Sequence, residues 1–398
     1  MVSGNKLHSI RQSPREPKFF QNPFPFYSEL RNLGSVVRWA DYEMPVSCDY
    51  SLVNKILRDK RFVREPINGF FSNTPAFLQP FYENESRSIL EREPPYHTRL
   101  KSAVLPFFTK KKLKVLESEI RGLCLDLLKD IPSKKFNIIE SFSKKFPVIV
   151  ICRLVGVPES MAAQLVTWSN KMVAMYQARR NRTIEKQAVL ATTSFSHYLT
   201  DLVQVKKKSN DHDLISYLVK NNESTKLLTT PEIVSTIILL LNAGHEATVH
   251  TISNGIKAMI ESKFTLKELG KNPQKLSAEI LRFSTPLHMF IRYSSIDMRL
   301  DNVRFKKGDK IGLLLAAANR DPKHFVSPEE FNPFIPRKPN LSLGAGLHFC
   351  LGAHLARLEL EIAMPILIEK FPKMNFAEPP QYEDNFHFYG LKELLLEF

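Results

Sequence analysis

Glycine is scarce in this chain: the 398 residues include only 14, about half the share of roughly 7% that is usual in proteins. Cysteine is scarcer still, and Cys48, Cys124, Cys152 and Cys350 are far apart, with no CxxC pair. This spacing argues against a disulfide framework and against a structural zinc site. We therefore expect the protein to work in the reducing cytoplasm.

Long apolar runs are also absent. The first twenty residues lack the apolar stretch of a signal peptide, and no run reaches the ~18 apolar residues of a membrane span. With 43% hydrophobic and 24% charged residues, the composition is that of an ordinary globular protein. No repeat, low-complexity tract or linker is visible, so a single domain over residues 1–398 is expected.

Acidic residues are outnumbered, and the net charge is +15. No helix-turn-helix, zinc-finger or RNP-type pattern is present, so nucleic-acid binding is not expected. Two interpretations remain open: a solvated basic surface, or a docking face for an acidic protein partner. The basic residues form short clusters at Lys110, Lys111, Lys112 and Lys114, at Arg179, Arg180 and Arg182, and at Lys206, Lys207 and Lys208.

The pattern along the chain predicts a mostly helical α+β protein. Residues 95–283 are mainly helical in pattern, whereas the first ninety residues are rich in proline and aromatics, with a strand-like piece at 35–40. Alternating and β-branched stretches in 292–316 predict short strands, with a turn at Gly308 and Asp309. A last amphipathic helix is expected at 351–371.

One helix stands out, beginning with Thr230 as its expected N-cap and Pro231 in the first turn. Residues 233–241 are apolar nearly all round, so this helix should be buried in the centre of the protein. Polar residues follow at 242–246, and polar groups in a buried helix must be satisfied or functional. They indicate either a water-bridged kink or a groove where Gly244 lets a flat group approach the backbone.

Three of the few glycines surround Cys350, which comes just before the last helix. Amide groups and the helix dipole at such a position favour the thiolate. Gly344 and Gly346 allow a tight turn, and Gly352 lets a planar group lie against the start of the helix. These features describe a thiolate with one side left free to bind another group. A nucleophile would need a histidine base, for which His348 is poorly placed, and a structural cysteine would not require three glycines.

Residues 343–352, LGAGLHFCLG, resemble the haem-binding loop of the cytochrome P450 family, FxxGxxxCxG, with Leu343 in place of phenylalanine. Four further segments are similar to motifs of that family: 279–282 to ExxR, 318–322 to ANRDP, 243–248 to the oxygen-binding groove, and 94–101 to PPxHxxxR. The resemblance extends from about residue 20 to the end. It implies a mainly α fold with a small β-rich part and the haem between the central helix and the cysteine loop.

The resemblance also implies the roles of single residues. Cys350 corresponds to the axial ligand of the haem iron, which favours O–O cleavage. Lys101 stands where the family often has arginine, and it can neutralise a propionate without a bidentate fork. The implied haem-binding set is Cys350, His348, His97, Lys101, Arg292, Gly344, Gly346, Gly352 and Phe349.

The catalytic set implied on the central helix is Gly244, Glu246, Ala247 and Thr248. The family usually has an acid followed by threonine, whereas here Ala247 follows Glu246. Thr248 is no automatic substitute, because the next helical position points ~100° away. Substrate or water must then supply the missing hydroxyl, or the enzyme handles oxygen unusually.

The ExxR pair, Glu279 and Arg282, is expected to be structural. Its third partner in the family is the arginine of FDxxR, and the corresponding text here is FNPFIPR. Arg337 comes two residues later than the arginine of that motif, and we expect it to complete the network.

The implied function is that of a monooxygenase with haem b. It would take two electrons from a ferredoxin or flavodoxin with its reductase, split dioxygen, and oxidise a small, largely apolar organic substrate. Two alternatives remain: a peroxygenase that uses peroxide, favoured by Ala247, and a haem-based sensor without turnover, which would need no acid at Glu246. Residues 286–290 are expected to face the substrate. The aromatic residues of 67–82, Phe70, Phe71, Phe77 and Phe81, form either a lid over the pocket or part of the core.

Overall fold

The computed structural model describes residues 7–71, 74–132, 134–209, 211–301 and 303–398. The chain forms two compact units. Unit 1 comprises residues up to Val63, Ser118–Lys144 and Ala247–Phe398, and unit 2 comprises Arg64–Glu117 and Lys145–Glu246. Because the chain passes between the units several times, no linker separates them in the sequence. The single domain expected from the sequence stays a prediction.

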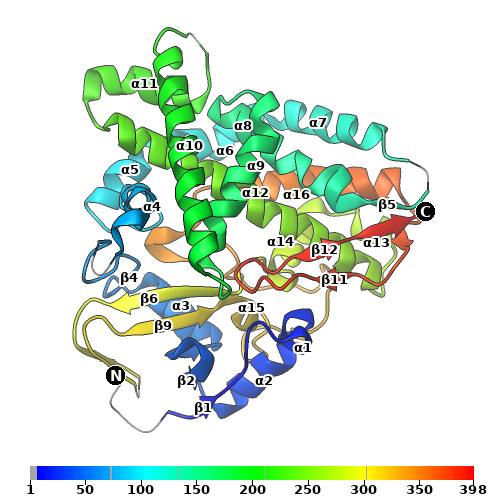
Figure 1. Ribbon diagram of the computed structural model, residues 1–398. Helices are drawn as coiled ribbons and strands as arrows, with labels where there is room; N and C mark the ends of the chain where they lie inside the picture. Colours follow the sequence, from blue (N-terminus) through cyan, green and yellow to red (C-terminus); the bar gives the residue numbers. More distant parts are fainter. Residues whose placement is uncertain (1–6, 72–73, 133, 210, 302) are drawn as a thin grey trace. The chain divides into compact units, whose positions relative to one another are not determined.

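Unit 1 contains all the strands that the structure describes (Figure 1). Its largest sheet has the order β1-β2-β3-β9-β6-β4, in which β6 and β9 are antiparallel with Arg292 opposite Ile311. The predicted turn at Gly308 is confirmed, since its φ is 91° and its amide donates to the Ser294 carbonyl. The strands of this sheet are β1 (Ser9–Ile10), β2 (Val37–Trp39), β3 (Met44–Ser47), β4 (Phe62–Val63), β6 (Met289–Ser294) and β9 (Lys310–Leu314).

Shorter sheets complete the β part of unit 1. One has the order β10-β13-β5, and the other two are the pairs β11–β12 and β7–β8. Their bounds are β5 (Phe136–Asn137), β7 (Met298–Leu300), β8 (Val303–Phe305), β10 (Asn375–Phe376), β11 (Gln381–Tyr382), β12 (Leu391–Glu393) and β13 (Leu395–Glu397).

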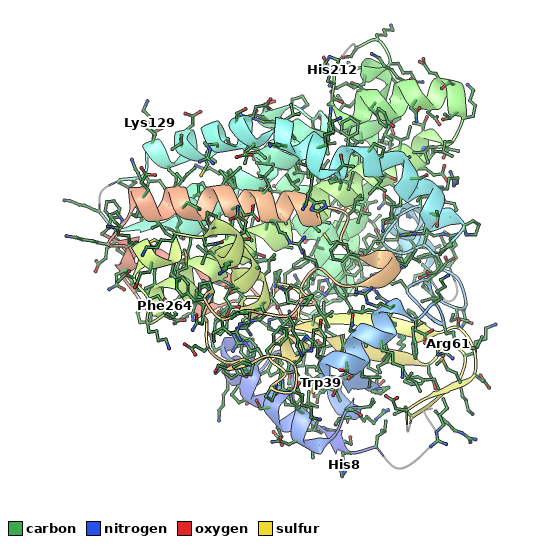
Figure 2. The ribbon with its side chains drawn as sticks, turned by 180° about the vertical axis from the view of Figure 1, so that it is seen from behind. His8, Trp39, Arg61, Lys129, His212 and Phe264 are labelled. Atoms are coloured by element: carbon green, nitrogen blue, oxygen red, sulfur yellow. The ribbon has the colours of Figure 1, made fainter. Side chains whose placement is uncertain are left out.

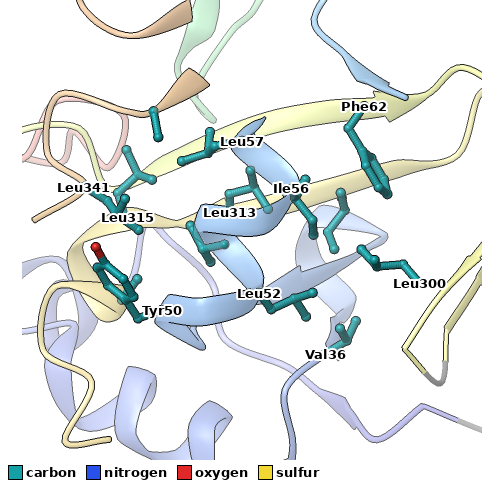
Figure 3. Packing of buried hydrophobic residues seen from close by; sticks show 14 of the residues in the cluster. Val36, Tyr50, Leu52, Ile56, Leu57, Phe62, Leu300, Leu313, Leu315 and Leu341 are labelled. Carbon is teal, nitrogen blue, oxygen red and sulfur yellow. The ribbon is translucent and has the colours of Figure 1, made fainter. Parts of the chain in front are cut away.

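Two apolar clusters pack some helices of unit 1, α1, α2, α3 and α15, against its large sheet. In one, Leu52 and Ile56 of α3 pack with Leu313 of β9 (Figure 3). In the other, Trp39, labelled in Figure 2, is fully buried. Its ring contacts those of Phe19 and Phe26. The helices wholly or mainly in this unit are α1 (Pro17–Gln21), α2 (Phe24–Leu33), α3 (Tyr50–Arg58), α7 (Glu117–Lys129), α13 (Leu266–Leu269), α14 (Pro273–Phe283), α15 (Leu315–Ala318) and α16 (Ala353–Lys370), with short turns η1 (Ala40–Tyr42), η4 (Ile139–Ser143) and η7 (Gly346–His348).

Unit 2 consists of helices and the loops that join them in the part that the structure describes, as the pattern of residues 95–283 predicts. The long helix α10 packs against α9 and, near its start, against α4 (Figure 1). The helices are α4 (Gln79–Glu85), α5 (Tyr96–Val104), α6 (Lys110–Val115), α8 (Lys145–Val155), α9 (Ala162–Val173), α10 (Arg182–Lys206) and α11 (Leu214–Thr225), with η2 (Ala76–Leu78), η3 (Leu105–Phe108), η5 (Glu159–Met161) and η6 (Ala174–Tyr176).

The central helix of the sequence is α12 (Thr230–Glu261), whose first half belongs to unit 2 and second half to unit 1. Its predicted burial is confirmed, with Ile233, Ile237 and Leu241 each at most 2% exposed. The predicted cap is wrong by one residue: Thr229 hydrogen-bonds with Glu232 at the helix start, and Thr230 is already helical. The last helix likewise begins at Ala353 rather than Leu351.

Candidate active site

The loop before α16 places Cys350 in a tight turn. Its amide donates to the Leu343 carbonyl (3.0 Å), and Gly344 and Gly346 both have left-handed backbones, with φ of 70° and 71°. A Cβ atom on Gly346 would lie 2.3 Å from the Leu57 carbonyl oxygen. Gly346 is therefore required both by its conformation and by the close approach of the end of α3.

The Cys350 thiol differs from the other thiols of the chain. Burial raises the pKa of Cys48 to about 11 and those of Cys124 and Cys152 to about 12, so these three stay protonated at neutral pH. Cys350 is half-buried and comes three residues before the first residue of α16. A position at a helix N-terminus favours the thiolate, which is the form that binds metals.

The surroundings of this thiol fit a flat apolar group. The side chains of Leu347 and Phe349 are 37% and 40% exposed, so apolar surface on both sides of His348 is uncovered by the protein. A Cβ atom on Gly352 would meet only the Cys350 sulfur, at 4.0 Å. Haem has the shape and the apolar faces to cover this surface, and the Cys350 thiolate would bind its iron.

Asn319 holds the start of the cysteine loop. Its side-chain amide donates to Ser342 (2.7 Å) and to Thr285 (2.8 Å), and its oxygen accepts from the Leu341 amide (2.7 Å). Asn319 is fully buried. This positioning role was not predicted, although the ANRDP segment was the signal that pointed to the residue.

The ExxR network is present as expected. Glu279 and Arg282 are each 1% exposed and form a two-bond ion pair of 2.7 and 2.8 Å. Arg337 donates to Glu279 at 3.2 Å, which confirms the prediction for this residue. The backbone amide of Asn332 also donates to Glu279 (2.9 Å), a partner that the sequence did not suggest.

The predicted haem-binding residues are divided between the units. In unit 1, Arg292 is buried on β6 and donates to the Ile291 carbonyl, while His348 is half-buried in η7. In unit 2, His97 and Lys101 are one turn apart on α5, so they share a face of that helix. Their roles toward haem stay predictions.

The middle of α12 is helical without interruption through residues 242–246. His245 is buried, with Nδ1 2.7 Å from the Leu241 carbonyl oxygen and Nε2 3.5 Å from the Glu246 carboxylate. At Gly244 the structure corrects the expectation. A Cβ atom there would lie 2.8 Å from Ile151 of α8, so helix packing, rather than a flat ligand, explains the glycine.

A stripe of α12 next to these residues is uncovered. Ala243 is exposed and Ala247, one turn later, is half-buried, as are Asn242, Gly244 and Glu246, whereas most of the helix is buried. Thr248 is only 6% exposed. The Thr251 hydroxyl, one turn further along the helix, donates to the Ala247 carbonyl (2.7 Å). Residue 247 itself offers only a methyl group and no hydroxyl.

The aromatic segment 67–82 belongs in part to the core, and its role as a lid stays a prediction. Phe70 and Phe81 are buried and belong to the core, whereas Phe71 is 51% exposed. Ser72 and Asn73, in the middle of this segment, lie outside the described residues. Residues 64–65, before the segment, are joined to residues 92–93, well after it, by the Arg64 amide donating to Glu93 (2.7 Å) and by an ion pair of Arg92 with Glu65 (3.0 Å).

Comparison with known proteins agrees with this site. The cytochrome P450 family model matches residues 17–276 and 274–388. The biotin biosynthesis cytochrome P450 of Bacillus subtilis (strain 168) is 32% identical, over 98% of this chain and 100% of that protein. The cytochrome P450 monooxygenase PikC of Streptomyces venezuelae is 31% identical, over 91% and 87%. Among solved structures, P450BioI in complex with a hexadec-9Z-enoic acid-ligated acyl carrier protein superposes with a TM-score of 0.90 and 31% identity, covering 96% of this chain and 100% of that one.

The chain therefore belongs to the cytochrome P450 family and has its fold. It is an oxidoreductase of the bacterial monooxygenase type with a haem-thiolate centre. None of the described helices combines the length and apolar character that crossing a lipid bilayer requires.

Proposed function

We propose that this monooxygenase holds haem b through Cys350, takes electrons from a ferredoxin or flavodoxin with its reductase, and oxidises a largely apolar acyl chain in the cytoplasm. The observation that carries the proposal is the half-buried Cys350 on its glycine-built loop at the start of α16. When bound, the haem supplies the binding and activation of dioxygen. The cysteine spacing, without a disulfide, supports the cytoplasm.

The chain's own residues position the cofactor and move protons. His348, Arg292, His97 and Lys101 supply the positive charge and donors that haem propionates need. Glu246 is the acid on α12 beside the uncovered alanine stripe. Its carboxylate can take up and release a proton there, whereas Ala247 offers no hydroxyl to pass it on.

The substrate class follows from the uncovered stripe and from a relative. Ala243 and Ala247 present only methyl groups, which suit an apolar chain better than a polar one. The related P450BioI was crystallised with a fatty acyl chain carried by an acyl carrier protein. Fatty acyl compounds are therefore the first substrates to test.

The thiolate assignment is tested by spectroscopy. The reduced protein with carbon monoxide should show the red-shifted Soret band of a thiolate-ligated haem, and Cys350→His should remove that shift while haem stays bound. A Soret band that the substitution leaves in place would overturn the assignment.

Turnover then separates the alternatives. Purified enzyme is given hexadecanoic acid with NADPH and a ferredoxin–reductase pair, or with hydrogen peroxide alone. Product only in the first case supports the monooxygenase, and product only with peroxide supports the peroxygenase that Ala247 favours. Ligand-induced spectral shifts without product in either case would support a haem-based sensor.

A further inference from the structure

The connection between α9 and α10 is fastened to the aromatic segment within unit 2. Three of its side chains each contact one side chain of residues 76–85. The Arg182 guanidinium lies 3.2 Å from the centre of the Phe77 ring, Arg180 donates to the Tyr82 hydroxyl at 3.2 Å, and the Tyr176 hydroxyl donates to Glu85. Whatever binds at this connection therefore touches residues that hold the predicted lid.

The same connection carries an excess of positive charge. Residues 177–190 include four cations, Arg179, Arg180, Arg182 and Lys186, and a single carboxylate, Glu185. Arg180 (2.9 Å) and Arg182 (3.7 Å) share this carboxylate. Arg179 and Lys186 are exposed, and no carboxylate among the described residues is within ion-pair distance of either.

These cations border an exposed apolar side chain. Arg182, Lys186 and Leu190 follow one another at intervals of four residues, so they lie along one face of α10. Leu190 is 68% exposed, whereas Ala188 and Ala191 on the inner side are buried. An apolar contact bordered by charges of one sign is the arrangement that recognises an amphipathic surface of the opposite sign.

We propose that this basic face, Arg179, Arg182, Lys186 and Leu190, docks an acidic acyl carrier protein that presents the substrate as a thioester on its flexible arm. The inference rests on the proposed acyl substrate. A free fatty acid has one carboxylate and cannot use three cations around an exposed leucine, whereas an acidic helix can contact all of them. The arm of a carrier docked here starts beside Phe77 and Tyr82 of the lid segment.

The test compares two double variants of the haem-loaded enzyme. Arg179→Gln/Lys186→Gln removes two cations that make no lid contact, and Lys207→Gln/Lys208→Gln removes two exposed cations beyond the other end of α10. The dissociation constant of hexadecanoyl carrier protein is measured by calorimetry at low and high salt. We expect it to rise about five-fold in the first variant, to change less than about two-fold in the second, and to rise with salt in the unsubstituted enzyme.

Equal dissociation constants in both variants would overturn the docking face. So would binding to vesicles of anionic phospholipid without binding to the carrier protein. Free hexadecanoic acid, followed by the haem spectrum, separates this inference from the proposed function. It should bind both variants equally. One result would support the docking face but overturn the proposed substrate. In it, carrier binding depends on Arg179 and Lys186, but neither free hexadecanoic acid nor hexadecanoyl carrier protein is oxidised.

Discussion

Arg337 lies 3.2 Å from the carboxylate of Glu279, joining the segment before the cysteine loop to α14. Replacing Arg337 by methionine leaves the buried Glu279 with Arg282 and one amide donor, so we expect a loss of about 1–3 kcal/mol in the free energy of unfolding. Arg282→Met should cost more, because it also leaves the Pro328 and Asn319 carbonyls without their donor. Urea unfolding of the two variants measures both effects. An Arg337 variant as stable as the parent would show that this ion pair contributes nothing.

Gly346 and Gly352 should respond differently to the same substitution. Gly346→Ala forces a left-handed alanine against the Leu57 carbonyl, and we expect it to cost about 2–4 kcal/mol of stability. Gly352 has φ −80°, and its Cβ would meet only the Cys350 sulfur. Gly352→Ala should therefore leave folding intact but speed the loss of haem to an acceptor protein at least ten-fold. Normal haem retention in Gly352→Ala would contradict the cofactor position inferred from this glycine.

The sequence could predict features that depend on residues close together in the chain, but not features that depend on residues far apart in it. The burial of α12 and the turn at Gly308 follow from local patterns, and the structure has both. The contacts of Asn319 with Ser342 and of Gly244 with Ile151 join residues far apart in the chain, and no periodicity reports them. The same holds for Asn332, whose contribution to the ExxR network is a backbone amide, which every residue except proline possesses.

His288 makes the stability of unit 1 depend on pH. Burial, and then the charge of Arg320, lower its pKa to about 3, while its Nδ1 lies 2.8 Å from the Tyr27 hydroxyl. The folded state thus binds the proton less readily than the unfolded state, and acidification through the unfolded pKa of about 6.5 favours unfolding. By pH 5 this should lower the free energy of unfolding by about 2 kcal/mol.

The control for this effect is His288→Gln, which has no titrating group and still offers Tyr27 an acceptor. Unfolding free energies are measured between pH 7.5 and pH 5 for both proteins. The parent should lose about 2 kcal/mol more than the variant over this range. Parallel curves would mean that folding does not change the pKa of His288, and would overturn the prediction.

The lysine cluster of α6 is expected to steer the electron donor. Lys110, Lys111 and Lys114 are exposed, whereas the Lys112 ammonium lies 4.7 Å from the centre of the Phe107 ring. Replacing the three exposed lysines by glutamine should slow reduction by an acidic ferredoxin about ten-fold at low salt and much less at high salt. The Lys207→Gln/Lys208→Gln variant is the matched control. Unchanged stopped-flow rates in the α6 variant would exclude this cluster as the docking site.

Ala247 should make proton delivery depend on the substrate or on an ordered water. Glu246 provides an acid on α12, but the side chain at 247 is a methyl group, and the Thr248 hydroxyl is buried on another face. A substrate that carries a hydroxyl near its oxidation site could complete the relay, and electrons would then be coupled well to product. Substrates without this hydroxyl should release part of the electrons as hydrogen peroxide. Ala247→Thr should raise product formed per NADPH about two-fold or more for plain fatty acids and should not raise it for hydroxylated ones. Equal coupling for both proteins on both kinds of substrate would show that the missing hydroxyl at position 247 has no bearing on oxygen activation.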